Sequence, residues 1–329
     1  MKRLNGMDAM LLYSETPNLH THTLKIAIVD GSDFTFEVFR HTLLRRLHRL
    51  DPLRYKLVDI PWRLHHPMWL ENCEVDLDYH LRRVQVSAPG GRRELDELIG
   101  KVAGTPLDRG RPLWEFHFAE GLADHKIAII GKLHHALADG VASANLLARL
   151  MDLDGPVQDE RDTSENCIPP SKADLLRSAG RDHAQQVVAL PGLITEALSG
   201  LRRLRRRSRE RGAQPDLARL MQAPPTFINH MVSPIRTFAT ATLSLPQVKE
   251  TSKHLGITIN DTVMAMVAGA LRELLLRYDG SAERPIVASV PASTAGIQSA
   301  HSTHRCAASN TSGLVRRQCR ILLKNHSLE

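Results

Sequence analysis

Apolar and polar residues follow two periods along the first half of the chain, one typical of strands and the other of helices. Runs rich in β-branched residues predict buried strands, and apolar residues three and four positions apart predict helices. The predicted strands cover residues 23–29, 55–60, 115–120 and 126–133, and the predicted helices cover residues 36–50, 92–104 and 141–150. Strands that alternate with helices in this way indicate an α/β lobe with its own core.

The second half of the chain has a less regular pattern. Residues 154–172 are polar and contain three prolines and one glycine, which is typical of a linker. Helix-forming residues follow at 173–211, with an interruption expected at Pro191 and Gly192. We then expect a strand at 237–245, a helix that starts near Asn260 and a strand at 285–291. Residues 295–329 have no clear amphipathic period, so no element is predicted there.

Positive charge is concentrated in two short segments. The formal net charge is +7, but residues 201–211 hold seven arginines against one glutamate, and residues 295–329 hold five basic residues against one acidic residue. The rest of the chain is therefore mildly acidic. The arginines from Arg202 to Arg211 fit either a solvated helix face or attachment to anionic lipid at a membrane or lipid-droplet surface. No aromatic residues interleave with them, which argues against nucleic-acid binding.

Cysteine usage and sorting signals narrow the cellular setting. Cys73, Cys167, Cys306 and Cys319 lack the spacing of a metal site or a disulfide framework. No stretch reaches the length of a transmembrane helix, and the start lacks the apolar core of a secretory signal, so we expect a cytoplasmic protein. No glycine-rich phosphate-binding motif occurs, and no nucleotide cofactor is expected.

The candidate chemistry is concentrated in residues 134–140, which contain His134, His135, Asp139 and Gly140. These residues lie between a predicted strand and a predicted helix. A histidine at this junction projects from a rigid support, and an imidazole is mostly neutral at pH 7, the form that a general base requires. The alternatives are a hydrogen-bonded packing histidine and a metal ligand. Adjacent residues of a strand point to opposite faces, so we expect no metal here.

Two further motifs have both a structural and a functional interpretation. Pro112, Leu113 and Trp114 precede a predicted strand, where large apolar residues are typical of core packing. Their functional alternative is a wall of the substrate channel. Asn260 and Asp261 open a helical pattern, and both residue types are good N-caps. Their functional alternative is that Asn260 reaches the active-site channel and holds the reacting groups.

Four motifs in the correct order resemble a known family. Residues 134–140 read HHxxxDG, the signature of the CoA-dependent acyltransferase superfamily. The start of the chain at residues 1–13, the Pro-Leu-Trp motif within 111–115 and the Asn-Asp motif within 258–263 resemble, within that superfamily, the wax ester synthase/diacylglycerol acyltransferases of mycobacteria and related actinobacteria. The resemblance extends over residues 1 to about 294.

The resemblance implies a two-lobed α/β sandwich of the chloramphenicol acetyltransferase type, with His135 as the general base. His135 would take the proton of diacylglycerol or of a long-chain alcohol as that hydroxyl attacks the thioester of acyl-CoA, and no covalent acyl-enzyme would form. His134 would pack or position the strand, Asp139 would form a structural ion pair with an arginine, and Gly140 would allow a tight turn. Acyl-CoA is a substrate in this scheme, and no bound cofactor is implied.

The same resemblance implies four regions along the chain. Residues 1–158 form the lobe that carries HHxxxDG, 159–235 a linker with a basic helical segment, 236–294 a partial second lobe, and 295–329 an aberrant or disordered tail. We expect an incomplete second lobe, as a truncated or frameshifted gene copy would give. Two functional hypotheses follow: an acyltransferase that makes triacylglycerol or wax esters, and an inactive acyltransferase-like protein that binds lipid.

Overall fold

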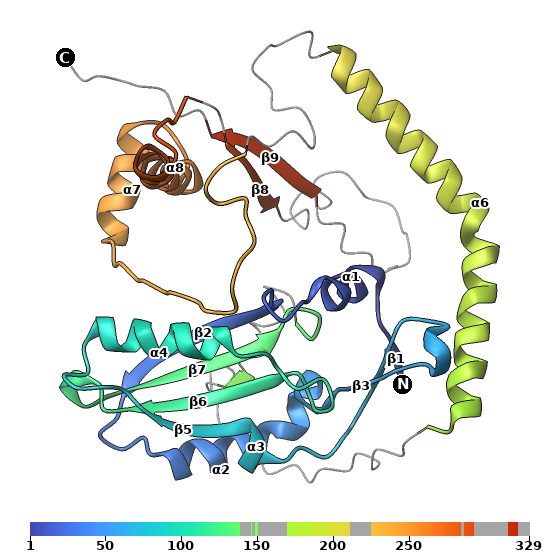
Figure 1. Ribbon diagram of the computed structural model, residues 1–329, viewed down its shortest axis with the longest axis horizontal. Coiled ribbons are helices and arrows are strands. Elements are labelled where there is room, and N and C mark those ends of the chain that lie inside the picture. Colours follow the sequence, from blue (N-terminus) through green and yellow to red (C-terminus); the bar gives the residue numbers. More distant parts are fainter. Residues whose placement is uncertain are drawn as a thin grey trace, which may run out of the picture. The chain divides into compact units, whose positions relative to one another are not determined.

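The chain divides into two compact units. A computed structural model describes residues 1–138, 146, 149–150, 170–210, 225–283, 286–292 and 315–321 (Figure 1). The first unit comprises Met1–Ala197 and Val232–Thr240, and the second comprises Leu198–Met231 and Ala241–Glu329. Of the predicted helix at 141–150, residues 146, 149 and 150 are described, and they are helical. The predicted region boundaries at residues 158 and 294 lie outside the described residues.

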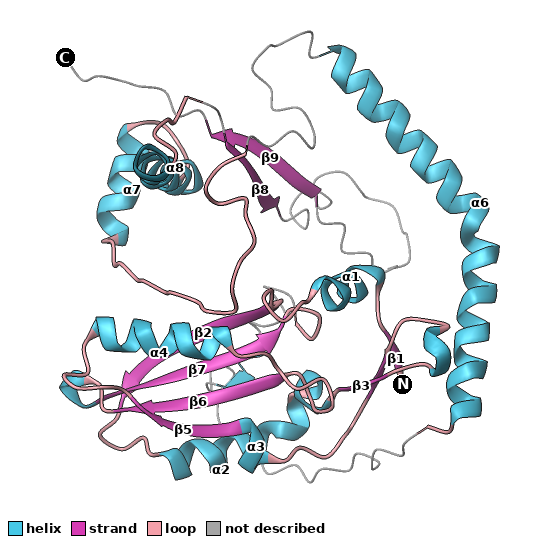
Figure 2. Ribbon diagram, in the orientation of Figure 1, coloured by secondary structure: helices cyan, strands magenta, loops and turns pink. Residues whose placement is uncertain are grey.

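The first unit is built on a four-stranded mixed sheet with the strand order β2, β7, β6, β5 (Figure 2). Its strands are His22–Asp30 (β2), Lys126–His134 (β7), Trp114–Glu120 (β6) and Leu81–Gln85 (β5). β7 is antiparallel to both neighbours, whereas β5 and β6 are parallel and are connected through helix α4 (Arg92–Gly104). A parallel pair requires such a crossover. The predicted strands at 23–29, 115–120 and 126–133 are confirmed, and β5 is a strand that the pattern missed.

Each face of this sheet carries its own hydrophobic core, because successive side chains of a strand point to opposite faces. On β7, Ile129 and Leu133 belong to the core that contains residues of helix α2 (Phe36–Arg46). Ala128 and Ile130 belong to the core under α4, and both helices lie along the sheet on opposite sides (Figure 1). The bounds predicted for α4, residues 92–104, are confirmed. Its apolar stripe consists of Leu95, Ile99 and Val102, which are all buried.

Helix α2 is shorter than predicted. The side chain of Thr35 caps its first turn by accepting a hydrogen bond from the Val38 N–H. The predicted helix extends to residue 50, but α2 ends at Arg46 and two 3-10 segments follow, Leu47–Arg49 and Asp51–Arg54. Pro52 lacks an N–H and restricts the residue before it, so an α-helix does not continue through this segment.

The first unit also contains a three-stranded antiparallel sheet with the order β1, β4, β3. Its strands are Lys2–Arg3 (β1), Met68–Leu70 (β4) and Lys56–Val58 (β3). Helix α1 (Gly6–Ser14) follows β1, and the short helix α3 (Leu77–His80) immediately precedes β5. The strand predicted at 55–60 is therefore present as the three-residue β3.

Helix α6 (Lys172–Glu210) runs without a break through Pro191, so the predicted interruption at Pro191 and Gly192 is wrong. A proline removes one backbone hydrogen bond from a helix and crowds the preceding turn. Val187, Leu190 and Ile194 around it are exposed, so a local distortion disturbs no core packing. Long runs of helix-forming residues on both sides continue the helix, because elongation is favourable once a helix has formed.

Besides the end of α6, the described residues of the second unit form two helices and a two-stranded antiparallel ladder. The helices are α7 (Leu245–His254) and α8 (Ile259–Tyr278), and the ladder pairs β8 (Ile286–Ala292) with β9 (Val315–Ile321). The predicted helix near Asn260 and the strand at 285–291 are confirmed as α8 and β8. Within the described ranges no single helix is long and apolar enough to cross a membrane, although α7 and α8 together pass on length and composition with a 100° bend between them.

Two expectations for the later part of the chain differ from the structure. The strand predicted at 237–245 is wrong, because residues 237–244 form no strand and α7 begins at Leu245. Thr240 gives its N–H and its hydroxyl to the Asp96 carboxylate of α4 instead of to a neighbouring strand. β9 lies in the segment 295–329, where no element was predicted, because its three arginines interrupt the apolar alternation.

Candidate active site

The two adjacent histidines lie where β7 ends, between the ends of its two neighbouring strands. The His134 N–H donates to the Leu113 carbonyl, N to O 3.0 Å, beside the start of β6. The His135 N–H donates to the Thr21 carbonyl, N to O 2.9 Å, beside the start of β2. His134 is 1% exposed and His135 is half-buried. The backbone of the pair is therefore anchored on both sides, and only the second side chain reaches the surface.

The imidazole of His134 is held by hydrogen bonds at both nitrogens. Its Nδ1 accepts the Ala136 N–H at 3.0 Å, so this nitrogen carries a lone pair. Its Nε2 lies 2.9 Å from the Thr21 hydroxyl oxygen and 3.3 Å from Oε1 of Glu15. A carboxylate only accepts hydrogen bonds, so we assign the proton to Nε2. Both nitrogens are thereby engaged, and His134 is not free to exchange a proton with a substrate.

Glu15, directly after α1, supplies the carboxylate that contacts the imidazole of His134. Its Oε1 accepts the Thr21 N–H at 2.9 Å, and its Oε2 accepts Nη2 of Arg109 at 2.9 Å. Burial opposes ionisation, but the hydrogen bonds from His134, Thr21 and Arg109 outweigh it and hold the pKa of Glu15 well below its usual range. Arg109 also donates to the Leu12 carbonyl of α1. This network joins four separate segments of the chain.

The imidazole of His135 differs from that of its neighbour. It makes no hydrogen bond to another described residue, and its Nδ1 is shielded from solvent. Asp139 and Gly140, the other two residues of the motif that were singled out, lie outside the described residues. Among residues that are described, no group of three or more histidine, cysteine and acidic side chains is arranged to hold a metal ion.

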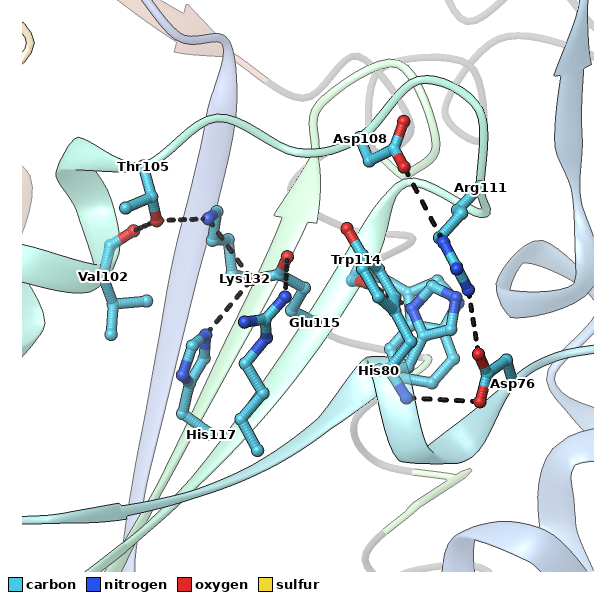
Figure 3. Close-up of polar contacts among 12 residues, drawn as sticks. Asp76, His80, Val102, Thr105, Asp108, Arg111, Trp114, Glu115, His117 and Lys132 are labelled. Atoms are coloured by element: carbon cyan, nitrogen blue, oxygen red, sulfur yellow. Dashed lines mark hydrogen bonds and ion pairs between the residues drawn. The ribbon is translucent and has the colours of Figure 1, made fainter.

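Beyond the end of α4, the sheet face that α4 covers carries Arg82, Glu115, His117 and Lys132, here called the charged cluster. Figure 3 shows Glu115, His117 and Lys132 of this cluster. Glu115 is its centre, with 5% of its side chain exposed. The distances from its carboxylate oxygens are 3.3 Å to Nη2 of Arg82, 3.3 Å to Nε2 of His117 and 3.4 Å to Nζ of Lys132. Burial raises the pKa of Glu115, but these three donors outweigh burial and leave that pKa below its usual value.

Lys132 and His22 connect the charged cluster with the end of α4. The Lys132 side chain is fully buried, and its Nζ donates to the Thr105 hydroxyl at 3.0 Å. Burial lowers the pKa of Lys132, although Glu115 acts in the opposite direction. Nε2 of His22 donates to the Ala103 carbonyl at 2.9 Å, and burial together with the positive charge of Lys132 lowers the pKa of His22 to about 4. The positive charge of Lys132 lies beside the C-terminal end of α4, where the negative end of the helix dipole stabilises it.

The Pro-Leu-Trp motif is buried beside the histidines. Leu113 and Trp114 are fully buried, and the Leu113 carbonyl is the acceptor for the His134 N–H. The indole N–H of Trp114 donates to the Leu53 carbonyl at 2.7 Å, and the ring of His80 stacks on it with 4.3 Å between centroids (Figure 3). Pro112 is buried as well. The motif therefore packs the core and positions the backbone of the histidine pair.

The Asn-Asp motif belongs to the second unit and lies in the first turn of α8. The N-cap is Thr258, whose hydroxyl accepts the Asp261 N–H at 3.1 Å. The Asp261 carboxylate accepts the Thr258 N–H at 3.0 Å, which closes a capping box. The N-cap was expected at Asn260 or Asp261, but it is Thr258. Asp261 completes the cap from the third helical position. Asn260 is exposed.

Described residues of the first unit line two hollows. One has a volume of ≈480 Å³ and is lined partly by the charged cluster, through Arg82, Glu115 and His117. The other has a volume of ≈310 Å³ and lies beside His80 and Arg111. Neither of these two is lined by His135. The sequence did not reveal the charged cluster or Glu15, although charged residues two positions apart within strand-like runs were a usable signal.

Sequence comparison relates the chain to a family of lipid-modifying enzymes. The sequence profile named wax ester synthase/diacylglycerol acyltransferase catalytic domain matches residues 4–263. A protein of Mycobacterium tuberculosis strain H37Rv, named as a candidate diacylglycerol O-acyltransferase, is 54% identical over 297 residues, which are 89% of this chain and 62% of that protein. A second such protein of the same strain is 38% identical over 301 residues, 89% of this chain and 59% of its own length. The chain thus spans about three fifths of these relatives.

Structural comparison gives a consistent result. The wax ester synthase/diacylglycerol acyltransferase of Marinobacter aquaeolei VT8 aligns with a TM-score of 0.58 and 27% identity, over 88% of this chain and 64% of that protein. A condensation domain of the calcium-dependent antibiotic synthetase aligns with a TM-score of 0.50 and 17% identity, over 97% of this chain and 68% of that chain. The second likeness concerns the fold alone. Both confirm the α/β fold class expected from the sequence.

Proposed function

The chain belongs to the wax ester synthase/diacylglycerol acyltransferase family, and on that basis we propose that it transfers a long-chain acyl group from acyl-CoA to a lipid hydroxyl, with His135 as the general base. The acceptor is diacylglycerol, which the names of the family and its members contain, or a long-chain alcohol, from which a wax ester is formed. The products are triacylglycerol and wax ester, respectively.

The proposed step is a direct transfer between the two substrates. His135 takes the hydroxyl proton while the alcohol oxygen attacks the thioester carbonyl carbon. A carbon–oxygen bond forms, the carbon–sulfur bond breaks, and the CoA sulfur leaves as a thiolate that takes the proton from the imidazolium. An alcohol is too weak an acid to ionise beforehand, so removal of its proton during the attack contributes about 10²- to 10⁴-fold to the rate.

The difference between the two histidines carries this proposal. His134 has both ring nitrogens in hydrogen bonds, whereas the ring of His135 makes none with another described residue. The backbone of His135 is nevertheless fixed to Thr21 at the end of a central strand. A general base needs this combination of a rigid support and a nitrogen that is free to accept a proton. Among the described residues, His135 meets both conditions and His134 does not.

The test compares acyl-CoA turnover by the wild-type protein, His135→Ala and the control His41→Ala, with diacylglycerol and with hexadecanol as acceptors. His41 is an exposed histidine of α2, so its replacement leaves the site unchanged. We expect His135→Ala to lose about 10²- to 10⁴-fold in kcat and the control to keep wild-type turnover. Wild-type turnover in His135→Ala would overturn the mechanism. No turnover by the wild type, together with lipid binding, would favour the lipid-binding hypothesis.

We further propose that α6 attaches the protein to an anionic lipid surface. Val187, Leu190, Ile194, Leu198 and Leu201 follow each other at spacings of three and four residues, and each is at least 45% exposed. Four exposed arginines follow within the next turns: Arg202, Arg203, Arg205 and Arg206. An apolar stripe beside clustered arginines suits the boundary between headgroups and acyl chains.

Replacement of these four arginines by glutamine tests the attachment. We expect a clear loss of co-sedimentation with vesicles that contain anionic lipid, because each basic residue near such a surface contributes about 1 kcal/mol. Vesicles of neutral lipid alone serve as the control and should bind both proteins equally. If the quadruple variant binds anionic vesicles as the wild type does, the attachment proposal is wrong.

A further inference from the structure

One carboxylate connects the two histidines of the candidate site. Glu15 accepts the Thr21 N–H at 2.9 Å and lies 3.3 Å from the protonated Nε2 of His134. Arg109 donates to its other oxygen at 2.9 Å. The Glu15 side chain is 18% exposed, so these contacts form mostly out of water, where charge-assisted hydrogen bonds are strong. The carboxylate thus binds three donors from three different segments.

Thr21 connects Glu15 with both histidines through hydrogen bonds. Its N–H binds Glu15, its hydroxyl oxygen lies 2.9 Å from Nε2 of His134, and its carbonyl accepts the His135 N–H at 2.9 Å. The Thr21 hydroxyl also donates to the Leu11 carbonyl of α1 at 3.1 Å. A shift of Thr21 therefore moves an acceptor away from each histidine. Glu15 is the charged group that prevents that shift.

We propose that Glu15 is a positioning residue, whose carboxylate holds Thr21 and His134 so that the His135 imidazole is presented to the substrates. The inference rests on the proposed role of His135 as the base. Glu15 itself touches neither the reacting atoms nor the His135 ring. A displacement of about 1 Å in a catalytic group is enough to cost about 10²-fold in rate, so loss of this support lowers kcat.

A purely structural role is the competing explanation, because Glu15 also forms an ion pair with Arg109. Such a pair would affect the amount of folded protein rather than the rate per folded molecule. The two roles also differ in their dependence on His135. A positioning residue acts through the group that it positions, so its removal has no further effect on turnover when that group is already absent.

The experiment measures kcat and KM for Glu15→Ala and Glu15→Gln in the wild-type protein and in His135→Ala. The control is Asp30→Asn, since Asp30 is an exposed carboxylate at the other end of β2 that accepts hydrogen bonds from the neighbouring Ser32. We expect Glu15→Ala to lower kcat about 10- to 100-fold with little change in KM. Glu15→Gln should lose less, because its amide oxygen still accepts from Thr21 and His134. In the His135→Ala background, Glu15→Ala should cause no further loss.

Amide hydrogen exchange tests the positioning without any assay of activity. We expect faster exchange at the Thr21 and His135 amides in Glu15→Ala and unchanged exchange there in Asp30→Asn. Unchanged kcat, an equal loss in both backgrounds, or unchanged exchange would overturn the inference. If Glu15→Ala does not fold, Glu15→Gln supplies the same comparisons. Full turnover in His135→Ala would instead refute the proposed role of His135 as the base, and the exchange rates would still report whether Glu15 holds the pair.

Discussion

The α4-facing side of the main sheet has two halves that differ in what covers them. In the first half, Ala128 and Ile130 are fully buried under the apolar stripe of α4. In the second half, α4 has ended at Gly104, and the same strands carry the charged cluster, His22 and His134. The strands and their alternation are continuous across the boundary. The end of one helix thus separates an apolar part of this face from a part that carries charged side chains and His134.

The largest change in stability that would test this difference between the two halves is expected on replacement of Lys132. Lys132→Met keeps the length of the side chain but removes a fully buried charge, so the Glu115 carboxylate remains buried with two donors instead of three. We expect the free energy of unfolding to fall by about 3 kcal/mol, as measured by urea denaturation.

Two variants define the controls for Lys132. Lys132→Met combined with Glu115→Gln should recover most of the loss, because no unpaired charge is left in the interior. Ile130→Val in the apolar half should cost only about 1 kcal/mol, as for a single buried methyl group. Equal losses in Lys132→Met and Ile130→Val would show that charge pairing does not distinguish the two halves.

A smaller effect is expected from the titration of His22. Its pKa in the folded protein is about 4, compared with 6.5 for an unperturbed histidine, so between these values the unfolded chain binds a proton that the folded chain does not. Stability should therefore decrease as the pH falls from 6.5 to about 4.

The variant that isolates this titration is His22→Gln, which retains an N–H donor for the Ala103 carbonyl but cannot titrate. Between pH 6.5 and 4.5, the free energy of unfolding should fall more in the wild type than in this variant. The difference should be less than about 1 kcal/mol, since the site is partly solvated. Denaturation midpoints at three pH values measure the difference. Parallel pH dependence in both proteins would contradict a neutral His22 in the folded state.

The elements that could be predicted from the sequence are those with a clear period. β7 contains the continuous apolar run Ile127–Ile130. The predicted bounds of α4 agree with the structure because its apolar stripe and its terminal glycine mark them. β5 was missed because two adjacent arginines occupy its centre, where a half-exposed edge strand tolerates charge. The segment at 237–244 has strand-like residues but binds α4 through Thr240. This tertiary contact overrides the local strand propensity.

The site was only partly accessible to sequence reasoning. The histidine pair is adjacent in sequence and its position at the end of a strand was predictable from the apolar run before it. Glu15 and Arg109 lie far from it along the chain, and an isolated glutamate or arginine has no local pattern. The burial of the Glu115 and Lys132 side chains could not be predicted from their residue types, since charged residues are rarely buried without partners. Their partnership arises from the register of β6 on β7, which pairs them directly.

The two backbone hydrogen bonds of the histidine pair also bear on how the protein is made. The Leu113 and Thr21 carbonyls belong to segments on either side of β7, and Thr21 and His134 are 113 positions apart in the chain. In a nascent chain that has emerged from the ribosome only as far as β6, neither histidine N–H is yet available to these carbonyls. The geometry of the histidine pair is therefore acquired only after β7 has emerged and has paired with β2 and β6, and contacts of such long range form slowly.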